Sequence, residues 1–329
     1  MQVVDFHCDT LSVLCESLRH GTPKAFLEND LHIDLNKLKK GDYLLQCFAA
    51  FIHLKHEEIH PLASALEQID MFYQIMEEFP DRIGPVKTWA DLEENRKKGR
   101  IGAMLTVEDG GCCLGNLSVL RVLYRLGVRI MTLTWNFENE LGWPNAAAGA
   151  AENSQPSNGR RGLKETGFAF LREMERLGMI VDVSHLSDDG FWDVVRHTSR
   201  PFIASHSNAR AKCSHMRNLT DDMIRAISER GGLTGINYCA AFLDEQDAPE
   251  KCRSTVSLMA DHIEHIRQVG GIDMIGLGSD FDGIENNLEM RDCSMLSMLE
   301  AELRRRHYSG DAIEKIFHGN ALRLLGEFL

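Results

Sequence analysis

Eight short stretches along the chain consist almost wholly of apolar residues, and most of them are followed by a stretch with an amphipathic pattern. The apolar stretches cover residues 3–9, 43–52, 101–109, 128–136, 179–185, 201–206, 232–238 and 274–280. A near-continuous run of Val, Ile, Leu, Met and Ala is what a strand buried on both faces requires. The pattern therefore predicts eight strands of a parallel sheet.

The stretches between these strands have the pattern of helices with recognisable ends. In "NLSVLRVLYRLG" and "LREMERLG" the helical pattern stops at Gly127 and Gly178, and an apolar strand follows at once. Glycine just past a helix end is the expected stop signal, and Thr220 in "TDDMIRAISERGG" is placed to cap the start of another helix. Eight strand–helix units predict an α/β fold, a TIM (β/α)8 barrel. A doubly wound open sheet is the second possibility, but no GxGxxG turn follows any strand.

The chain shows no shift in composition that would mark a second domain, so we expect residues 1–329 to form a single domain. The candidate metal ligands described below indicate that this domain is a metal-dependent hydrolase barrel. One segment, residues 138–161, breaks the strand–helix rhythm and is rich in Gly, Ala, Asn and Pro. It follows the fourth predicted strand. We expect a long loop there, on the side of the barrel where active sites lie.

Composition narrows the classes of partner and the compartment. The 49 acidic residues outnumber the 36 Lys and Arg residues, which gives a net charge of −13 and argues against nucleic acid or an anionic membrane as a partner. No apolar run is long enough to span a bilayer. The nine cysteines lack CxxC spacing, which favours reduced, buried thiols. Because the first residues resemble a strand and not a basic leader, we expect a cytoplasmic protein.

A local motif, "HEEIH" from His56 to His60, matches the H-E-x-x-H pattern of many zinc proteases. That pattern needs both histidines on one face of a helix. Pro61 follows directly and biases His60 away from helical geometry. The segment also lies in a polar connection after the second strand. We therefore interpret the match as a coincidence on the surface.

A stronger signal is spread over the ends of five predicted strands. Two of its side chains stand two positions apart at the end of the first strand, which on a strand would put them on the same face. The others come at the ends of the third, fifth, sixth and eighth strands. In a parallel barrel these ends meet at one mouth, where barrel enzymes have their active sites. The six residues are His7, Asp9, Glu108, His185, His206 and Asp280.

Imidazole and carboxylate without thiolate suit a catalytic zinc or a related divalent ion. All of these residues except Asp280 would make five ligands, which is too many for one open site. Two divalent metal ions that share a bridging carboxylate would use all five and leave room for a bridging hydroxide. Glu108, the only carboxylate at the end of the third strand, is the natural bridge.

Five motifs in order, "DFHCDT", "TVEDG", "VDVSH", "ASHSN" and "GSDFDG", resemble the signatures of the membrane (renal) dipeptidase family, within the amidohydrolase superfamily. The resemblance runs from residue 3 to the C-terminal helix. It implies a metallo-dipeptidase that holds two zinc ions and cleaves dipeptides by attack of the bridging hydroxide. It also implies a ligand assignment, in which one ion is held by His7 and Asp9, the other by His185 and His206, and Glu108 bridges.

The same resemblance implies two further roles. Asp280 would handle the proton of the attacking water and of the leaving amine, which leaves poorly unless it is protonated. Arg217, in "SHMRN", would bind the free carboxylate of the substrate, since a guanidinium can hold a carboxylate through two hydrogen bonds. The resemblance also suggests a homodimer.

The sequence departs from the family in two respects. Trp135 stands where animal members carry a histidine that contacts substrate, and an indole cannot accept a hydrogen bond or take up a proton. We therefore expect Trp135 to alter the substrate range. Whether the substrates include dipeptides with a D-residue at the C-terminal position stays open. Animal members are also secreted and lipid-anchored. In this chain the segment "IFHGNALRLLGEFL" is amphipathic and does not resemble the hydrophobic tail of a lipid-anchored protein.

Two alternatives to a dipeptidase stay open at this point. The same scaffold and metals could deacylate an N-acyl amino acid, because fold and metals do not fix the substrate. A protein that holds metal without turnover is the other alternative, although the intact ligand set and the acid at Asp280 argue against it.

Overall fold

Eight parallel strands form a closed barrel, which confirms the predicted TIM barrel. The protein is described by a computed structural model over residues 1–56, 58–145, 161–246, 248–285 and 287–329. The barrel strands are β1 (Val3–Asp5), β2 (Tyr43–Phe51), β4 (Ile101–Glu108), β5 (Val128–Thr132), β6 (Ile180–Asp182), β7 (Ile203–Ala204), β8 (Leu233–Ile236) and β9 (Ile275–Leu277). Their order is β2-β1-β9-β8-β7-β6-β5-β4, and a pairing of β2 with β4 closes the ring. Each strand lies inside one of the eight apolar stretches.

The sheet contains one more strand than the pattern predicts. Strand β3 (Ile83–Pro85) pairs in parallel with the first three residues of β4, where Ile83 lies opposite Ile101. Three residues, one of them a proline, are too few to show a strand pattern in the sequence. This short strand widens the sheet at the end of the barrel remote from the candidate ligands.

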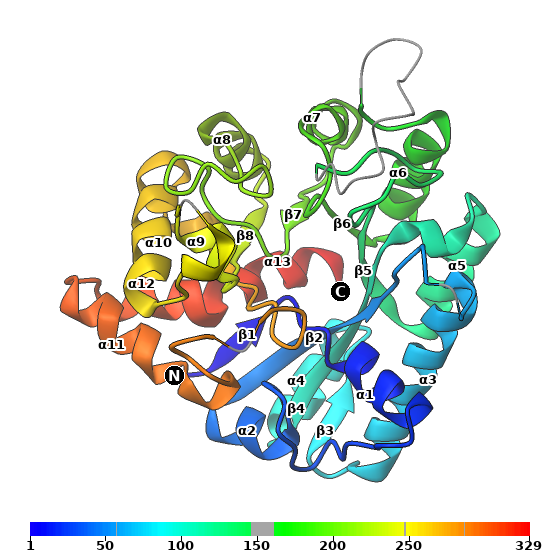
Figure 1. The fold of residues 1–329 in the computed structure, drawn as a ribbon, viewed down its shortest axis with the longest axis horizontal. Coiled ribbons are helices and arrows are strands. Elements are labelled where there is room, and N and C mark those ends of the chain that lie inside the picture. Colours follow the sequence, from blue (N-terminus) through cyan, green and yellow to red (C-terminus); the bar gives the residue numbers. More distant parts are fainter. Residues whose placement is uncertain (57, 146–160, 247, 286) are drawn as a thin grey trace.

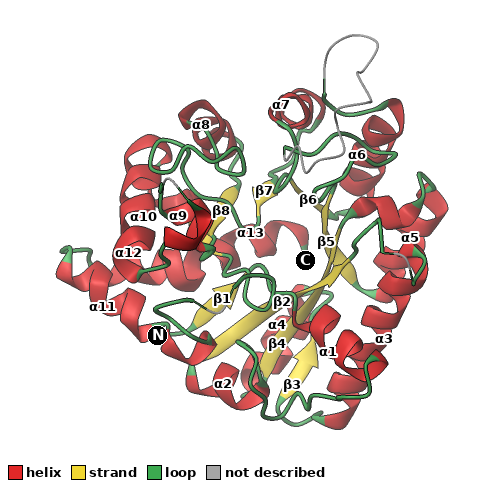
Figure 2. Cartoon of the chain, viewed as in Figure 1, coloured by secondary structure: helices red, strands yellow, loops and turns green. Residues whose placement is uncertain are grey.

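Helices surround the barrel on the outside (Figures 1 and 2). In the first half of the chain they are α1 (Thr10–Arg19), α2 (Leu35–Lys40), α3 (Pro61–Glu78), α4 (Trp89–Lys97) and α5 (Leu117–Leu126). In the second half they are α6 (Glu165–Leu177), α7 (Asp188–His197), α8 (Asp221–Glu229), α9 (Ala240–Leu243), α10 (Val256–Gly270), α11 (Ser297–Arg305), α12 (Gly310–Glu314) and α13 (Asn320–Phe328).

Three helix ends predicted from the sequence are found in the structure. Gly127 and Gly178 follow α5 and α6 with φ of 112° and 77°, in the left-handed region that favours glycine. Thr220 precedes α8, and its side chain accepts a hydrogen bond from the backbone N–H of Met223. These ends hold the helices to lengths that return the chain to the barrel.

Apolar side chains fill the barrel at one end. A cluster of buried residues joins the strand interiors to α13, and it includes Val4, Phe6, Leu45, Met104, Ile130, Ile180, Ile203, Leu233, Leu324 and Leu325. A second, larger cluster packs the helices against the outside of the strands. Because α13 covers the end of the barrel where the strands begin, the polar side chains gather at the other end, where the strands finish.

Of the predicted loop 138–161, residues 146–160 lie outside the described part of the chain. Its two flanks are held in place, because Gly142 pairs with Leu163 and Pro144 pairs with Leu186. The nine cysteines are all free, and only Cys239 is not fully buried. Among the described residues every helix is too short or too polar to cross a membrane.

Candidate active site

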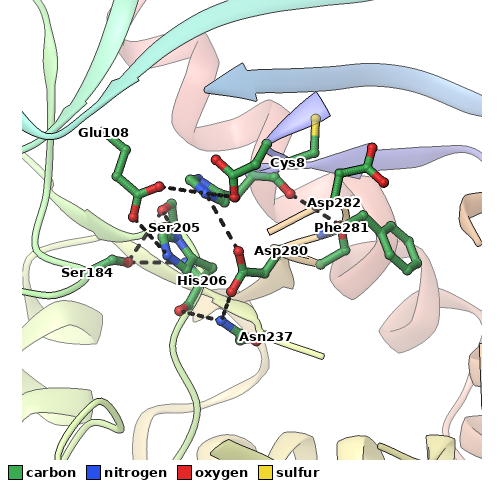
Figure 3. Close-up of polar contacts among 12 residues, drawn as sticks. Cys8, Glu108, Ser184, Ser205, His206, Asn237, Asp280, Phe281 and Asp282 are labelled. Atoms are coloured by element: carbon green, nitrogen blue, oxygen red, sulfur yellow. Dashed lines mark hydrogen bonds and ion pairs between the residues drawn. The ribbon is translucent and has the colours of Figure 1, made fainter. Parts of the chain in front are cut away.

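The structure brings the six predicted site residues together at the mouth of the barrel. Each one comes at or just after the end of a strand, and each is 8% exposed or less. They are His7 and Asp9 after β1, Glu108 at the end of β4, His185 after β6, His206 after β7, and Asp280 after β9. In Figure 3, Glu108, His206 and Asp280 point toward the same space.

Glu108 lies between histidines that come from different parts of the barrel. Its Oε2 atom is 3.1 Å from His7 Nε2, and its Oε1 atom is 3.0 Å from His185 Nε2 and 3.6 Å from His206 Nε2. The two oxygens thus face two different groups of side chains. This is the arrangement expected of a carboxylate that bridges two ions.

Three overlapping groups of these residues have ligand atoms within 4.8 Å of one another. The groups are His7, Asp9 and Glu108; Glu108, His185 and His206; and His7, His206 and Asp280. On the His7 side, Asp9 Oδ2 lies 3.5 Å and Asp280 Oδ1 lies 3.8 Å from His7 Nε2. The first two groups match the two predicted ion sites and share only Glu108.

The hydrogen bonds of the site leave a set of lone pairs without a partner. Ser205 Oγ donates to Asp182 Oδ2 at 2.5 Å, so it accepts from His206 Nδ1 at 2.7 Å. In the same way Asn136 Oδ1, an acceptor, receives the Nδ1 proton of His185 at 3.1 Å. Both histidines are therefore the tautomer whose Nε2 atom carries a lone pair.

These two Nε2 atoms are only 3.1 Å apart and both face Glu108. In addition His7 Nε2, Asp9 Oδ1 and Glu108 Oε1 are buried atoms without a hydrogen-bond partner among the described residues. Buried polar atoms are normally satisfied. A divalent cation would satisfy this cluster of nitrogen and oxygen lone pairs, so the residues fit a metal centre.

The charges of Glu108, His185 and His206 agree with that fit. Burial disfavours the charged form of His7, but Glu108 and Asp9 outweigh it and raise the pKa of His7 well above its usual value, so His7 would have to release a proton to bind an ion. Burial lowers the pKa of His185 to about 4 and the pKa of His206 well below its usual value, so both are neutral ligands at pH 7. Burial disfavours the charged form of Glu108, but His7 and the other two histidines outweigh it and hold the pKa of Glu108 well below its usual value. Burial raises the pKa of Asp280 to about 7, which suits a group that exchanges protons near neutral pH.

The start of the site differs from its predicted local structure. Strand β1 ends at Asp5, so His7 and Asp9 are not neighbours on one strand face. Asp5 ends the strand by accepting a hydrogen bond from the backbone N–H of His7 at 3.0 Å, and Asp9 precedes the first residue of α1. The two side chains still converge, but through the turn between β1 and α1 and not through the alternation of a strand.

Two of the six site residues have an uncommon backbone. His185 and Asp280 have φ of 65° and 64°, in the left-handed region. Non-glycine residues are found there in only a few per cent of cases, and Asn, Asp and His are the most common among them. The chain turns sharply at both positions, directly after β6 and β9, and each turn directs a side chain into the mouth.

Sequence reasoning missed the residues that orient the ligands. Asn136 holds His185, Ser205 and Asp182 hold His206, and Asn237 Nδ2 donates to Asp280 Oδ2 at 2.8 Å. Ser205 and Asp182 lie inside two of the motifs, "ASHSN" and "VDVSH", so a signal for them was present. For Asn136 and Asn237 the sequence contains no comparable signal, because each contacts a residue more than forty positions away.

A cavity of about 510 Å³ opens over the candidate metal ligands. Asp9, Glu108, His185 and Asp280 form its floor. Its other described lining residues are Ser12, Val13, Glu16, Phe51, His53, Trp135, Asn136, Cys239, Ala240, Ala241, Phe242, Asp282, Gly283, Ile284, Glu285 and Asn287. Trp135 is thus placed in the wall of the cavity, where the sequence predicts a contact with substrate.

Arg217 is buried beside His206, one of the candidate metal ligands. Its Nη1 atom donates to Ser207 Oγ at 2.5 Å and its Nη2 atom donates to the carbonyl of His206 at 2.9 Å, while Nε has no partner among the described residues. Arg217 is not among the described residues that line the cavity. A direct contact with a substrate carboxylate therefore stays a prediction.

The "HEEIH" segment lies away from this centre. His60 has extended backbone with ψ of 137° and immediately precedes α3, which begins at Pro61. Residue 57 lies outside the described part of the chain. Among the described residues, neither His56 nor His60 belongs to a group that could hold a metal ion.

Comparison with known sequences gives one consistent result. The family profile described as "Membrane dipeptidase (Peptidase family M19)" matches residues 1–328. Dipeptidase aclJ of Aspergillus oryzae is 33% identical over 305 residues, which cover 90% of this chain and 69% of the relative. An uncharacterized dipeptidase of Schizosaccharomyces pombe is 33% identical over 339 residues, which cover 98% of this chain and 79% of the relative.

Solved structures agree with the sequence comparison. A structure described as the dipeptidase AC, a metallopeptidase of family M19, has a TM-score of 0.87 and 26% identity, and covers 100% of this chain and 98% of its own. A metallopeptidase from Rhodobacter sphaeroides, bound to a phosphinate mimic of the dipeptide L-Ala-D-Ala, has a TM-score of 0.87 and 25% identity, and covers 100% of this chain and 99% of its own. The chain belongs to the membrane dipeptidase family, peptidase family M19, and is a metal-dependent dipeptidase.

Proposed function

We propose that this metallo-dipeptidase holds two zinc ions, one between His7 and Asp9 and one between His185 and His206, with Glu108 shared by both. The observation that carries this proposal is the position of Glu108, whose two oxygens face separate groups of ligand atoms. Nitrogen and oxygen ligands without thiolate suit a catalytic zinc centre.

Two bound divalent ions would lower the pKa of a water molecule between them and polarise the carbonyl of the scissile bond. The protein itself supplies the remaining proton transfers. Asp280 Oδ1 faces the ligand group, while Asn237 fixes Oδ2. We assign to Asp280 the uptake of a proton from the attacking water and its delivery to the leaving amine.

The same proposal gives Arg217 the task of attracting the free carboxylate of the substrate. Its guanidinium is buried next to His206, and no acidic side chain forms an ion pair with it among the described residues. An unpaired buried cation at the edge of the site favours an anionic group nearby. Since a relative binds a mimic of L-Ala-D-Ala, we include dipeptides with a D-residue at the C-terminal position among the proposed substrates.

A cytoplasmic location also belongs to the proposal, and it is supported by nine cysteines that are all free. The homodimer stays a prediction.

The decisive experiment measures metal content and substrate class together. The zinc-loaded protein is offered a panel of dipeptides, L-Ala-D-Ala among them, and the matching N-acetyl amino acids. We expect two zinc ions per chain and amino-acid release from the dipeptides only. His185→Ala is the blank, because it removes a ligand of one ion, and Glu108→Gln should lower the content of both ions.

Each outcome has a distinct meaning. Release from the N-acetyl compounds alone would replace the dipeptidase by a deacylase on the same centre. A single bound ion in a fully active protein would refute the shared role of Glu108.

A further inference from the structure

The cavity over the metal ligands has two unlike sides, and the order of strands in the barrel sets them apart. In the closed ring of eight strands, β4 lies opposite β8 and β2 lies opposite β7. The loops that follow β2 and β5, the two neighbours of β4, form one side of the cavity. Helix α9, which follows β8, lines a second side, and residues of α1 and of the loop after β9 also line the cavity. Figure 1 shows α9 across the barrel from β5.

The side formed by the β2 and β5 loops is a wall of three rings, Phe51, His53 and Trp135. All three are half-buried and line the cavity. The Trp135 ring centre is 4.9 Å from that of Phe51 and 5.3 Å from that of His53, with interplanar angles of 80° and 57°. Phe137 packs behind, 5.1 Å from His53 and 5.6 Å from Trp135. The rings brace one another, so the wall is a preformed apolar surface.

One polar atom in this wall makes no hydrogen bond that would stabilise the fold. The Nδ1 atom of His53 is buried and has no hydrogen-bond partner among the described residues. The ring packs against Trp135 and Phe137. His53 therefore contributes to the wall as a packed ring and not through a hydrogen bond of Nδ1. Such a wall of packed rings can receive a ring from a ligand.

The opposite side of the cavity is made of three small residues and a single ring, Phe242. Cys239, Ala240 and Ala241 line it, next to Phe242. The Phe242 ring centre is 5.8 Å from the guanidinium carbon of Arg217. Arg217 therefore lies on the side of the small residues, across the mouth from the aromatic wall.

These two sides fix the direction of a dipeptide. If the substrate carboxylate is drawn toward Arg217, as in the proposed function on which this inference rests, the second residue lies beside Cys239, Ala240 and Ala241. The first residue then lies across the metal ligands, against the aromatic wall. The α9 side offers the second residue one ring, Phe242, while the wall offers the first residue three rings.

We propose that Phe51, His53 and Trp135 form the subsite for the first side chain of the dipeptide, and that the enzyme prefers an aromatic first residue followed by a small second residue. An aromatic side chain gains both apolar burial and ring contacts on this wall. The same side chain in the second position would meet small side chains and only one ring, that of Phe242.

The test compares two substrates with the same atoms in reversed order, L-Phe-L-Ala and L-Ala-L-Phe, with L-Ala-L-Ala as reference. We expect kcat/KM for Phe-Ala to exceed that for Ala-Phe by roughly 10-fold or more, the range expected for filling an apolar pocket. Equal values or a preference for Ala-Phe would overturn the inference. Failure on all three substrates would instead refute the dipeptidase proposal, so the two failures can be told apart.

Variants of His53 locate the preference in the wall. His53→Ala should lower kcat/KM for Phe-Ala about 5- to 10-fold, mainly through KM, and lower kcat/KM for Ala-Ala by a clearly smaller factor. His53→Phe restores a ring without nitrogen and should retain the preference for Phe-Ala. His60→Ala, at an exposed histidine on the same connection, is the matched control. An equal loss on Phe-Ala and Ala-Ala in His53→Ala would show a general role for His53 and would contradict the subsite.

Discussion

Lowering the pH from 8 to 5 should destabilise the fold through one histidine outside the metal centre. His262 lies in α10 and is 1% exposed. Its Nδ1 atom accepts a hydrogen bond from the backbone N–H of Ala209 at 3.1 Å, and its Nε2 atom donates to the carbonyl of Leu243 at 3.1 Å. If His262 Nδ1 took up a proton, its N–H would face the N–H of Ala209, and this hydrogen bond would be lost. Burial lowers the pKa of His262 to about 4 in the folded chain.

The sign and size of the effect follow from proton linkage. In the unfolded chain a histidine has a pKa of about 6.5, so between that pH and pH 4 the unfolded state binds a proton that the folded state does not. The stabilising contribution of neutral His262 is full above pH 6.5 and is lost as the pH falls toward 4. At pH 5 the loss comes to about 2 kcal/mol, and it approaches about 3 kcal/mol at its limit.

Urea unfolding of the wild type and of His262→Asn at pH 8 and pH 5 measures this term. Asparagine keeps an acceptor for the Ala209 N–H but does not titrate, so all other titrating groups cancel in the comparison. We expect the wild type to lose about 2 kcal/mol more than the variant between the two pH values. The same change at the exposed His20 is the control. Parallel losses in the wild type and in His262→Asn would refute the reasoning.

Three further outcomes can be checked directly. In Gly283→Ala the new methyl group would overlap the Asp9 carboxylate, so turnover should fall at least ~100-fold and the metal content should fall with it. Gly310→Ala is the control, because its methyl group meets nothing within 4 Å, and it should keep the turnover and the metal content of the wild type. Asn136→Ala removes the partner of His185 Nδ1 and should weaken metal affinity roughly 10- to 100-fold in a competition titration, while Asn136→Asp should retain most of it. Removing the metal with a chelator should lower the free energy of unfolding by about 3 kcal/mol relative to protein in excess zinc, as seen in a lower Tm; an unchanged Tm would show that no ion is bound.

The barrel and the clustering of the six site residues were predictable because both depend on a repeating rule. Each buried strand is a run of apolar residues, and each candidate ligand comes directly after such a run. In a parallel barrel all of these positions meet at one mouth, whatever the details of the loops. The pattern therefore identified His206 and Glu108 as neighbours although nearly a hundred residues separate them.

The parts that the sequence did not predict depend on distances that no local pattern encodes. Asn237 orients Asp280 from a loop after a different strand, and an asparagine after a strand is most often a turn residue. His53 follows an apolar run as the candidate ligands do, but its position in the cavity wall depends on Trp135, which lies in the loop after β5. The early end of β1 depends on a side-chain hydrogen bond of Asp5, and alternating polarity cannot reveal such a bond.

The left-handed backbone at His185 and Asp280 restricts how this site can evolve. At such a φ the residues that the chain accepts without rebuilding the loop are glycine, asparagine, aspartate and histidine, and three of these four carry side chains that can bind a metal. Most substitutions at either position would therefore strain the backbone and be removed by selection. Those that are tolerated mostly replace one side chain that can bind a metal by another. The fold holds the two positions within a metal-binding set of residues, so lineages could change the preferred ion or the acid–base group while the barrel and its loops stayed the same.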